Sequence, residues 1–201
     1  MELREAMEQI AEIRHQMART EVFRGYRAVP VAFSGVLAWA AAFYQAIWIK
    51  VPVAQSGLYL KLWIGAASLS ALVAGIEMVA RGRLVRSPLS RGITWLAVEQ
   101  FLPSLIAGGV VTIAVVRMGD SYLWLLPGLW AIFFALGIFA SCKLLPKPTY
   151  AVGFFYLIAG FLALTFAKDE FALSPWAMGL TFGIGQWIAS AVLYGTLERD
   201  A

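Results

Sequence analysis

Two carboxylates, Glu77 and Glu99, lie inside otherwise apolar stretches and are the residues best placed for chemistry. A carboxylate in such surroundings is costly unless it is paired, protonated or facing water. The short loop between the two stretches is rich in arginine, so both acids have cations nearby: Arg81, Arg83, Arg86 and Arg91. Proton binding and ion pairing are therefore the chemistry that these residue types support.

The two acids have different surroundings along the chain. Glu77 precedes Arg81 by four residues, a spacing that brings side chains together on one helical face, and a structural ion pair is favoured. Glu99 should lie about two turns inside its helix, at a depth similar to that of Glu77. The two acids could share one proton or the loop arginines, and Glu99 is the main candidate for a ligand-binding or proton-binding residue.

Single amides also occur within the apolar runs, at Gln45, Gln100 and Gln186. An amide in a membrane helix can bond to a neighbouring helix with an energy on the order of 1 kcal/mol. We interpret Gln45 and Gln186 mainly as structural ties, and keep all three as ligand candidates. Pro103 and Pro127 could kink their helices and free backbone carbonyls for a ligand.

The composition indicates the environment that holds these residues. The chain is 61% hydrophobic and 14% charged, with a mean hydropathy of +0.75, whereas about 25% of the residues in a soluble domain are charged. In lipid every backbone polar group needs an internal partner, and long apolar runs without alternation exclude a membrane β-barrel. We therefore predict an all-α polytopic membrane protein, a transmembrane helix bundle in the lipid bilayer.

The apolar runs predict six transmembrane helices, each close to the roughly 20 residues that cross a hydrocarbon core. Tryptophans suit the boundary between apolar and wet layers, and five lie near predicted helix ends: Trp48, Trp63, Trp95, Trp124 and Trp176. The predicted spans are Pro30–Ile49, Gly57–Ala80, Ile93–Val116, Tyr122–Cys142, Thr149–Ala167 and Pro175–Gly195.

Basic residues are distributed unequally between the two sides of this bundle. Twelve of the sixteen lysines and arginines fall on the side that holds both termini, and such an excess marks the cytoplasmic side. We expect a multi-pass protein of the inner (plasma) membrane with both termini in the cytoplasm. Residues 1–28 would form a cytosolic amphipathic helix, 29–196 the six-helix transmembrane domain and 197–201 a short cytosolic tail.

Small residues recur in the odd-numbered predicted spans, as Ser34-Gly35, Gly108-Gly109 and Ala159-Gly160, with fainter echoes at Gly75 and Gly137 in the even spans. This pattern is compatible with three repeated helical hairpins. Small residues also let membrane helices approach closely, which is the simpler interpretation. We expect the glycine motifs and Glu99 to face other helices.

Several functions are disfavoured by what the sequence lacks. His15 is the only histidine and Cys142 the only cysteine, so a metal site, an intrachain disulfide or a catalytic triad has too few residues to form. Cys142 should be a buried structural residue. We expect no cofactor, no enzyme activity and no nucleic-acid partner, because basic residues grouped at the ends of apolar runs reflect membrane topology.

Two functions remain. The favoured one is a non-enzymatic membrane protein that anchors or regulates a partner through residues 1–28, where apolar residues such as Ile10, Ile13 and Met17 recur at helical spacing. The partner would be a cytosolic protein or a second copy of the chain. The alternative is a small proton-coupled transporter or channel that uses Glu99.

Short motifs also carry a resemblance: Glu12-Ile13-Arg14 with Met17 and Arg19, Ser34-Gly35, Ala107-Gly108 with Thr112, Leu126-Pro127-Gly128-Leu129-Trp130, and Gly153 followed by Gly160. Over most of its length the chain resembles uncharacterised bacterial six-helix inner-membrane proteins. The resemblance brings no catalytic residues. It implies a winged-helix transcriptional regulator as a candidate partner, because such proteins are often encoded beside one. Relatives often have a histidine after Phe-Gly in the sixth span, where this chain has Phe182-Gly183 and then Gln186.

Overall fold

The computed structural model describes residues 27–84, 88–142, 144–167 and 171–199, and the regular structure within these ranges is entirely helical. This confirms the predicted all-α fold. The amphipathic helix expected over 1–28 lies almost wholly outside the described residues. The elements are α2 (Ala28–Trp48), α3 (Ser56–Leu84), α4 (Pro88–Met118), the 3-10 helix η1 (Asp120–Leu125), α5 (Leu126–Ser141), α6 (Thr149–Phe166), α7 (Pro175–Leu193) and the π-helical turn η3 (Tyr194–Glu198).

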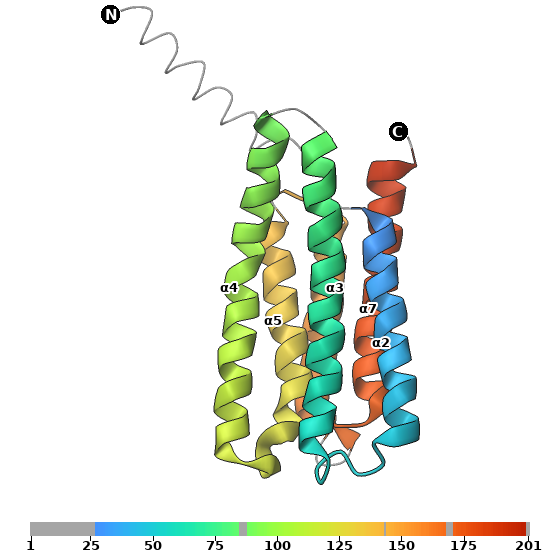
Figure 1. Cartoon of the computed structure of the whole chain (residues 1–201), viewed down its shortest axis with the longest axis vertical. Helices are drawn as coiled ribbons and strands as arrows, with labels where there is room; N and C mark the ends of the chain where they lie inside the picture. Colours follow the sequence, from blue (N-terminus) through green and yellow to red (C-terminus); the bar gives the residue numbers. More distant parts are fainter. Residues whose placement is uncertain (1–26, 85–87, 143, 168–170, 200–201) are drawn as a thin grey trace, which may run out of the picture.

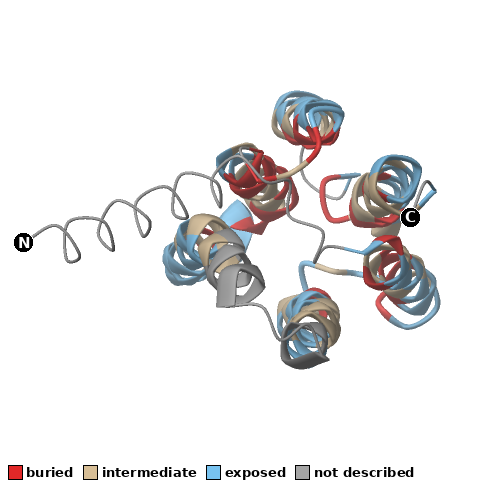
Figure 2. Cartoon of the chain, turned by 90° about the horizontal axis from the view of Figure 1, so that it is seen from above, coloured by how far each residue is buried: buried red, intermediate tan, exposed pale blue. Residues whose placement is uncertain are grey.

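The six long helices run up and down in turn and form a ring in chain order, which α7 closes by returning to α2 (Figures 1 and 2). The most extensive pairings are α2 with α7 and α5 with α6, whereas α3 and α4 touch each other much less. In a repeated-hairpin model the units would be α2 with α3, α4 with α5, and α6 with α7. The two most extensive pairings instead join helices of different hairpins.

Among the described residues, six helices are long and apolar enough to cross a membrane. The apolar spans of α3 and α4, Ser56–Ala80 and Val98–Met118, are only 6% buried within the chain, against 28–44% for the other four. The two helices thus form the outer, least covered side of the bundle. α2 begins and α7 ends at the same end of the molecule (Figure 1), which we call the terminal end.

Glycines explain why the two tightest pairs come so close. A Cβ atom added at Gly183 on α7 would lie 2.5 Å from Trp39 of α2, and one at Gly160 on α6 would lie 2.8 Å from the Gly128 carbonyl of α5. The motif at Gly35 packs in the same way, as expected. In the Gly108-Gly109 motif only Gly108 meets another helix: its added Cβ would lie 3.9 Å from Phe133 of α5, whereas nothing lies within 4 Å of one at Gly109.

Proline and glycine set the helix boundaries. Pro127 lies in the first turn of α5, where its missing N–H costs nothing, rather than inside a kinked span. Gly119, with φ of 112°, separates α4 from η1 in a conformation that other residues rarely adopt. α4 continues through Pro103, and Ser174 caps α7 by accepting a hydrogen bond from the Trp176 N–H at 3.3 Å.

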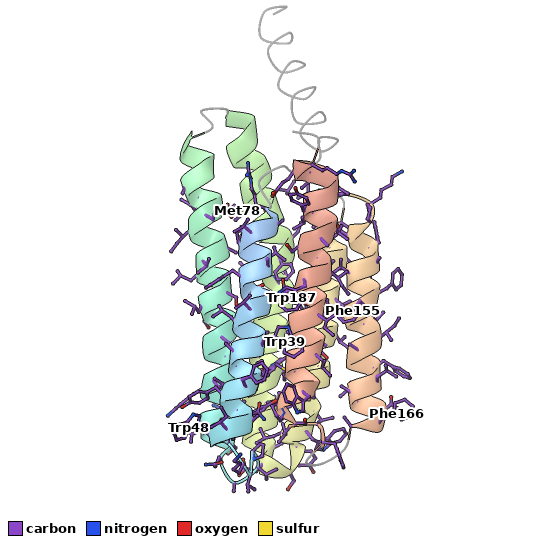
Figure 3. The ribbon with its side chains drawn as sticks, turned by 90° about the vertical axis from the view of Figure 1, so that its right-hand side faces the viewer. Trp39, Trp48, Met78, Phe155, Phe166 and Trp187 are labelled. Carbon is purple, nitrogen blue, oxygen red and sulfur yellow. The ribbon has the colours of Figure 1, made fainter. Side chains whose placement is uncertain are left out.

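Aromatic rings fill the interior of the bundle. Phe134 lies 4.8 Å from Tyr156, 5.4 Å from Phe101 and 5.8 Å from Phe182, measured between ring centroids, and the four residues come from α4, α5, α6 and α7. Between α2 and α7, the rings of Trp39 and Trp187 lie against each other in a tilted arrangement, with their centroids 5.9 Å apart (Figure 3). The described middle of the bundle is therefore a packed aromatic core.

Candidate functional site at the terminal end

α3 and α4 rise further than their neighbours at the terminal end. α3 continues to Leu84, and α4 begins at Pro88. Figure 1 shows both helices rising beyond the ends of α2 and α5.

This extension changes the predicted position of the loop. The loop was expected over residues 81–92, yet most of it is helical. Arg81, Arg83 and Arg91 belong to these helices, and Arg86 lies outside the described residues. The helical backbone at this end thus carries three of the four arginines that were assigned to the loop.

Glu99 does not face the bundle. Its side chain is exposed on α4. The expectation that Glu99 faces other helices is therefore wrong. Sequence composition locates a residue along a helix, but not the face that packs inward when most faces are apolar.

Glu77 is half-buried on α3 and contacts other parts of the chain, while the side chain of its expected partner Arg81 lies outside the described residues. Because Glu99 is exposed on a helix that barely touches α3, the two carboxylates occupy different surroundings. Gln100, next to Glu99, is half-buried, and its Oε1 atom has no hydrogen-bond partner among the described residues.

Gln45 is the fully buried polar residue at the other end of the bundle. Its Nε2 atom donates to the Leu173 carbonyl at 2.6 Å, and its Oε1 atom accepts from Trp63 Nε1 at 2.7 Å. The amide ties α2 to α3 and to the segment before α7, which is the structural role expected of it. Trp63 is only 4% exposed, so its ring packs inside the bundle.

A second polar tie joins α4 to α5 and was not predicted. Thr112 Oγ1 donates to the Gly108 carbonyl at 2.7 Å and accepts a hydrogen bond from Trp130 Nε1 at 2.8 Å. Gln186 on α7 lies beside the hydroxyl group of Tyr156, a fully buried residue of α6. The interior amides and hydroxyls are thus placed between helices, where polar groups hold membrane helices together.

At the terminal end the Ala28 peptide is held by α7 and its π-helical turn. Glu198 Oε1 accepts from the Ala28 N–H at 2.9 Å, Ser190 Oγ donates to the Ala28 carbonyl at 2.8 Å, and Arg27 Nε lies 4.0 Å from Glu198. We call these four residues the Ala28 clasp. The clasp was not predicted, because Glu198 was assigned to a tail. Its only signal in the sequence is an acid directly after the last predicted span.

The remaining reactive group is Cys142, which is 4% exposed at the end of α5, as predicted. Burial raises the pKa of its thiol, so the nucleophilic thiolate is scarce near neutral pH. Within the described ranges, no three metal-ligating side chains of histidine, cysteine, aspartate or glutamate come together. The described polar groups support helix ties and surface recognition.

Comparison of the chain with models of protein families, with curated proteins and with solved structures found no match. The function is therefore argued from the arrangement of the residues themselves.

Proposed function

We propose that this protein is a non-enzymatic integral membrane protein that anchors or regulates a partner at the terminal end of its bundle. The observation that carries this proposal is that α3 and α4 rise beyond the ends of α2 and α5 at this end (Figure 1). A loop that only connects two spans needs a few residues, whereas this hairpin continues as helix and carries Arg81, Arg83 and Arg91 in its sequence.

The partner best suited to this surface is a cytosolic protein with an acidic face. The excess of lysine and arginine at this end favours a cytoplasmic orientation in an inner membrane, and complementary charge guides association with acidic surfaces. Residues 1–28 enter the bundle at the same end through Ala28 and can contribute to the same docking site. The winged-helix regulator implied by the family resemblance is one candidate for this partner.

Transport receives less support than docking. A path across the membrane needs polar groups at successive depths, but Phe101, Phe134 and Phe182 pack together in the interior. Both polar atoms of the Gln45 amide already make hydrogen bonds within the bundle. Glu99, on which the transport hypothesis depended, is exposed on α4 and does not face the interior of the bundle. We therefore keep docking as the proposed function.

Site-specific photo-crosslinking in native membranes tests the proposal. A photoreactive residue at Leu84 should capture a defined cytosolic protein, and one at Val53, which lies at the opposite end, should not. The double variant Arg83→Glu/Arg86→Glu should lower capture at Leu84, while Arg117→Glu at the opposite end should leave it unchanged. Deleting Met1 to Thr20 tests the contribution of the amino-terminal segment.

Capture that is equal at Leu84 and Val53, or unaffected by the charge reversals, would contradict docking at this end. Adducts identified by mass spectrometry as the chain itself would assign the surface to self-association instead. Thermal unfolding of each purified variant shows whether the bundle has remained folded.

A further inference from the structure

A groove of about 390 Å³ lies between α2 and α7 at the terminal end. Large, exposed side chains border it: Val29, Trp187 and Tyr194 are 71%, 48% and 56% exposed. Figure 3 shows Trp187 on this side of the bundle. Between these residues the lining is small, which leaves the space open: Ala28, Ala32, Ser190 and Ala191.

The groove offers an apolar surface at the edge of the membrane. Among the lining residues, Ser190 has a hydroxyl group that already donates a hydrogen bond to the Ala28 carbonyl. Ala28 is the first residue of the α2 span, and Trp187 and Tyr194 are of the types that concentrate at membrane interfaces. An occupant must therefore be apolar within the groove and polar beyond Ala28.

The described residues at the polar end of the groove include two arginines. Arg27 is 45% exposed, and Arg199 is exposed directly after the π-helical turn. Glu198 is 16% exposed and is engaged by the Ala28 N–H and by Arg27. Among the described residues, two cations and one engaged carboxylate leave a net positive charge here, which complements an anionic head group.

We propose that this groove binds an anionic phospholipid, with one acyl chain lying between α2 and α7 and the phosphate at Arg27 and Arg199. The charge of the mouth selects an anionic head group over a zwitterionic one. The volume is in the range of small-ligand pockets. The site is independent of the docking function proposed above.

Native mass spectrometry of the full-length protein tests this proposal. The protein is purified in micelles that contain equal amounts of phosphatidylglycerol and phosphatidylcholine with identical acyl chains. We expect preferential retention of phosphatidylglycerol. Arg199→Gln, which removes no contact of the Ala28 clasp, should lower that preference roughly fivefold. Ala191→Phe fills the groove from an exposed position and should lower retention of both lipids.

Matched controls separate the site from general effects of charge and bulk. Arg117→Gln removes an exposed charge at the opposite end, and Ala67→Phe adds a ring to an exposed position on α3; neither should change lipid retention. Equal retention of the two lipids by the unmodified protein would overturn the proposal, as would an unchanged preference in Arg199→Gln. Loss of a dimer with Ala191→Phe, without change in lipid retention, would assign the groove to a second copy of the chain.

Discussion

The indole N–H of Trp63 on α3 donates a 2.7 Å hydrogen bond to the side-chain oxygen of Gln45 on α2. The same amide donates to the Leu173 carbonyl, so one buried side chain joins two helices and the segment that leads into α7. Removing either partner leaves a polar group unpaired in an apolar interior, which costs more than the bond itself contributes.

We predict that Gln45→Leu lowers the free energy of unfolding by about 1–3 kcal/mol. Trp63→Phe should also destabilise the protein, and the double variant should be less destabilised than the sum of the single ones, because the two residues share a hydrogen bond. Unfolding in mixed detergent micelles measures all three variants. Additive effects would show that the bond contributes nothing to stability.

Two glycines of the recurring small-residue motifs should respond differently to the same substitution. A methyl group at Gly160 would lie 2.8 Å from a backbone oxygen, and the backbone cannot move aside as a side chain can. Gly160→Ala should therefore lower stability by about 1–3 kcal/mol. Gly109→Ala meets open space and should leave the unfolding midpoint unchanged or raise it. Equal effects at the two positions would contradict the helix packing described above.

The contrast between Gly109 and Gly160 shows which features of the fold can be predicted from the sequence. The hydrocarbon thickness fixes how long an apolar helix must be, so the six helices could be predicted to within a few residues at most ends. The inward face could not be predicted, because Gly109 and Gly160 have equally apolar neighbours in sequence. The same reason placed Glu99 against other helices. The contact between Glu198 and Ala28 was not predicted, because Glu198 was assigned to a tail.

Cys142 gives a prediction on pH. Because burial raises the pKa of its thiol, the neutral form should persist above the usual range of a free cysteine. Alkylation by iodoacetamide in the folded protein should be slow at pH 7.5, and should rise with pH only above the range seen for a cysteine peptide. Mass spectrometry counts the modification, and unfolding in denaturant should restore rapid labelling. Rapid labelling of the folded protein at pH 7.5 would contradict the buried position.

The two acids near the terminal end should differ in their importance for stability. Glu99 is exposed, so Glu99→Gln should change the free energy of unfolding by less than about 0.5 kcal/mol. Glu198→Ala removes the acceptor for the Ala28 N–H and should cost about 1 kcal/mol. Thermal unfolding compares the two variants under one condition, and a larger loss from Glu99→Gln would restore an interior role for that carboxylate.

Membrane orientation is predicted from the distribution of charge. In a Cys142→Ser background, single cysteines at Ser56 and Asp120 should react with an impermeant maleimide from outside intact cells. Cysteines at Ser87 and Lys147 should react only after the membrane is opened, because the side rich in lysine and arginine stays in the cytoplasm. The opposite labelling pattern would invert the orientation and place the α3–α4 hairpin outside the cell.

The pairing of α2 with α7 also bears on how the chain is made. The face of α2 that carries Gly35, Trp39 and Ala42 packs on the last described span, and a ribosome takes on the order of ten seconds to synthesise the residues between them. During that interval the face must be covered by lipid or by the insertion machinery. A chain that stalls after Phe166 would keep it uncovered within the bilayer, where membrane quality-control proteases can distinguish it from the finished protein.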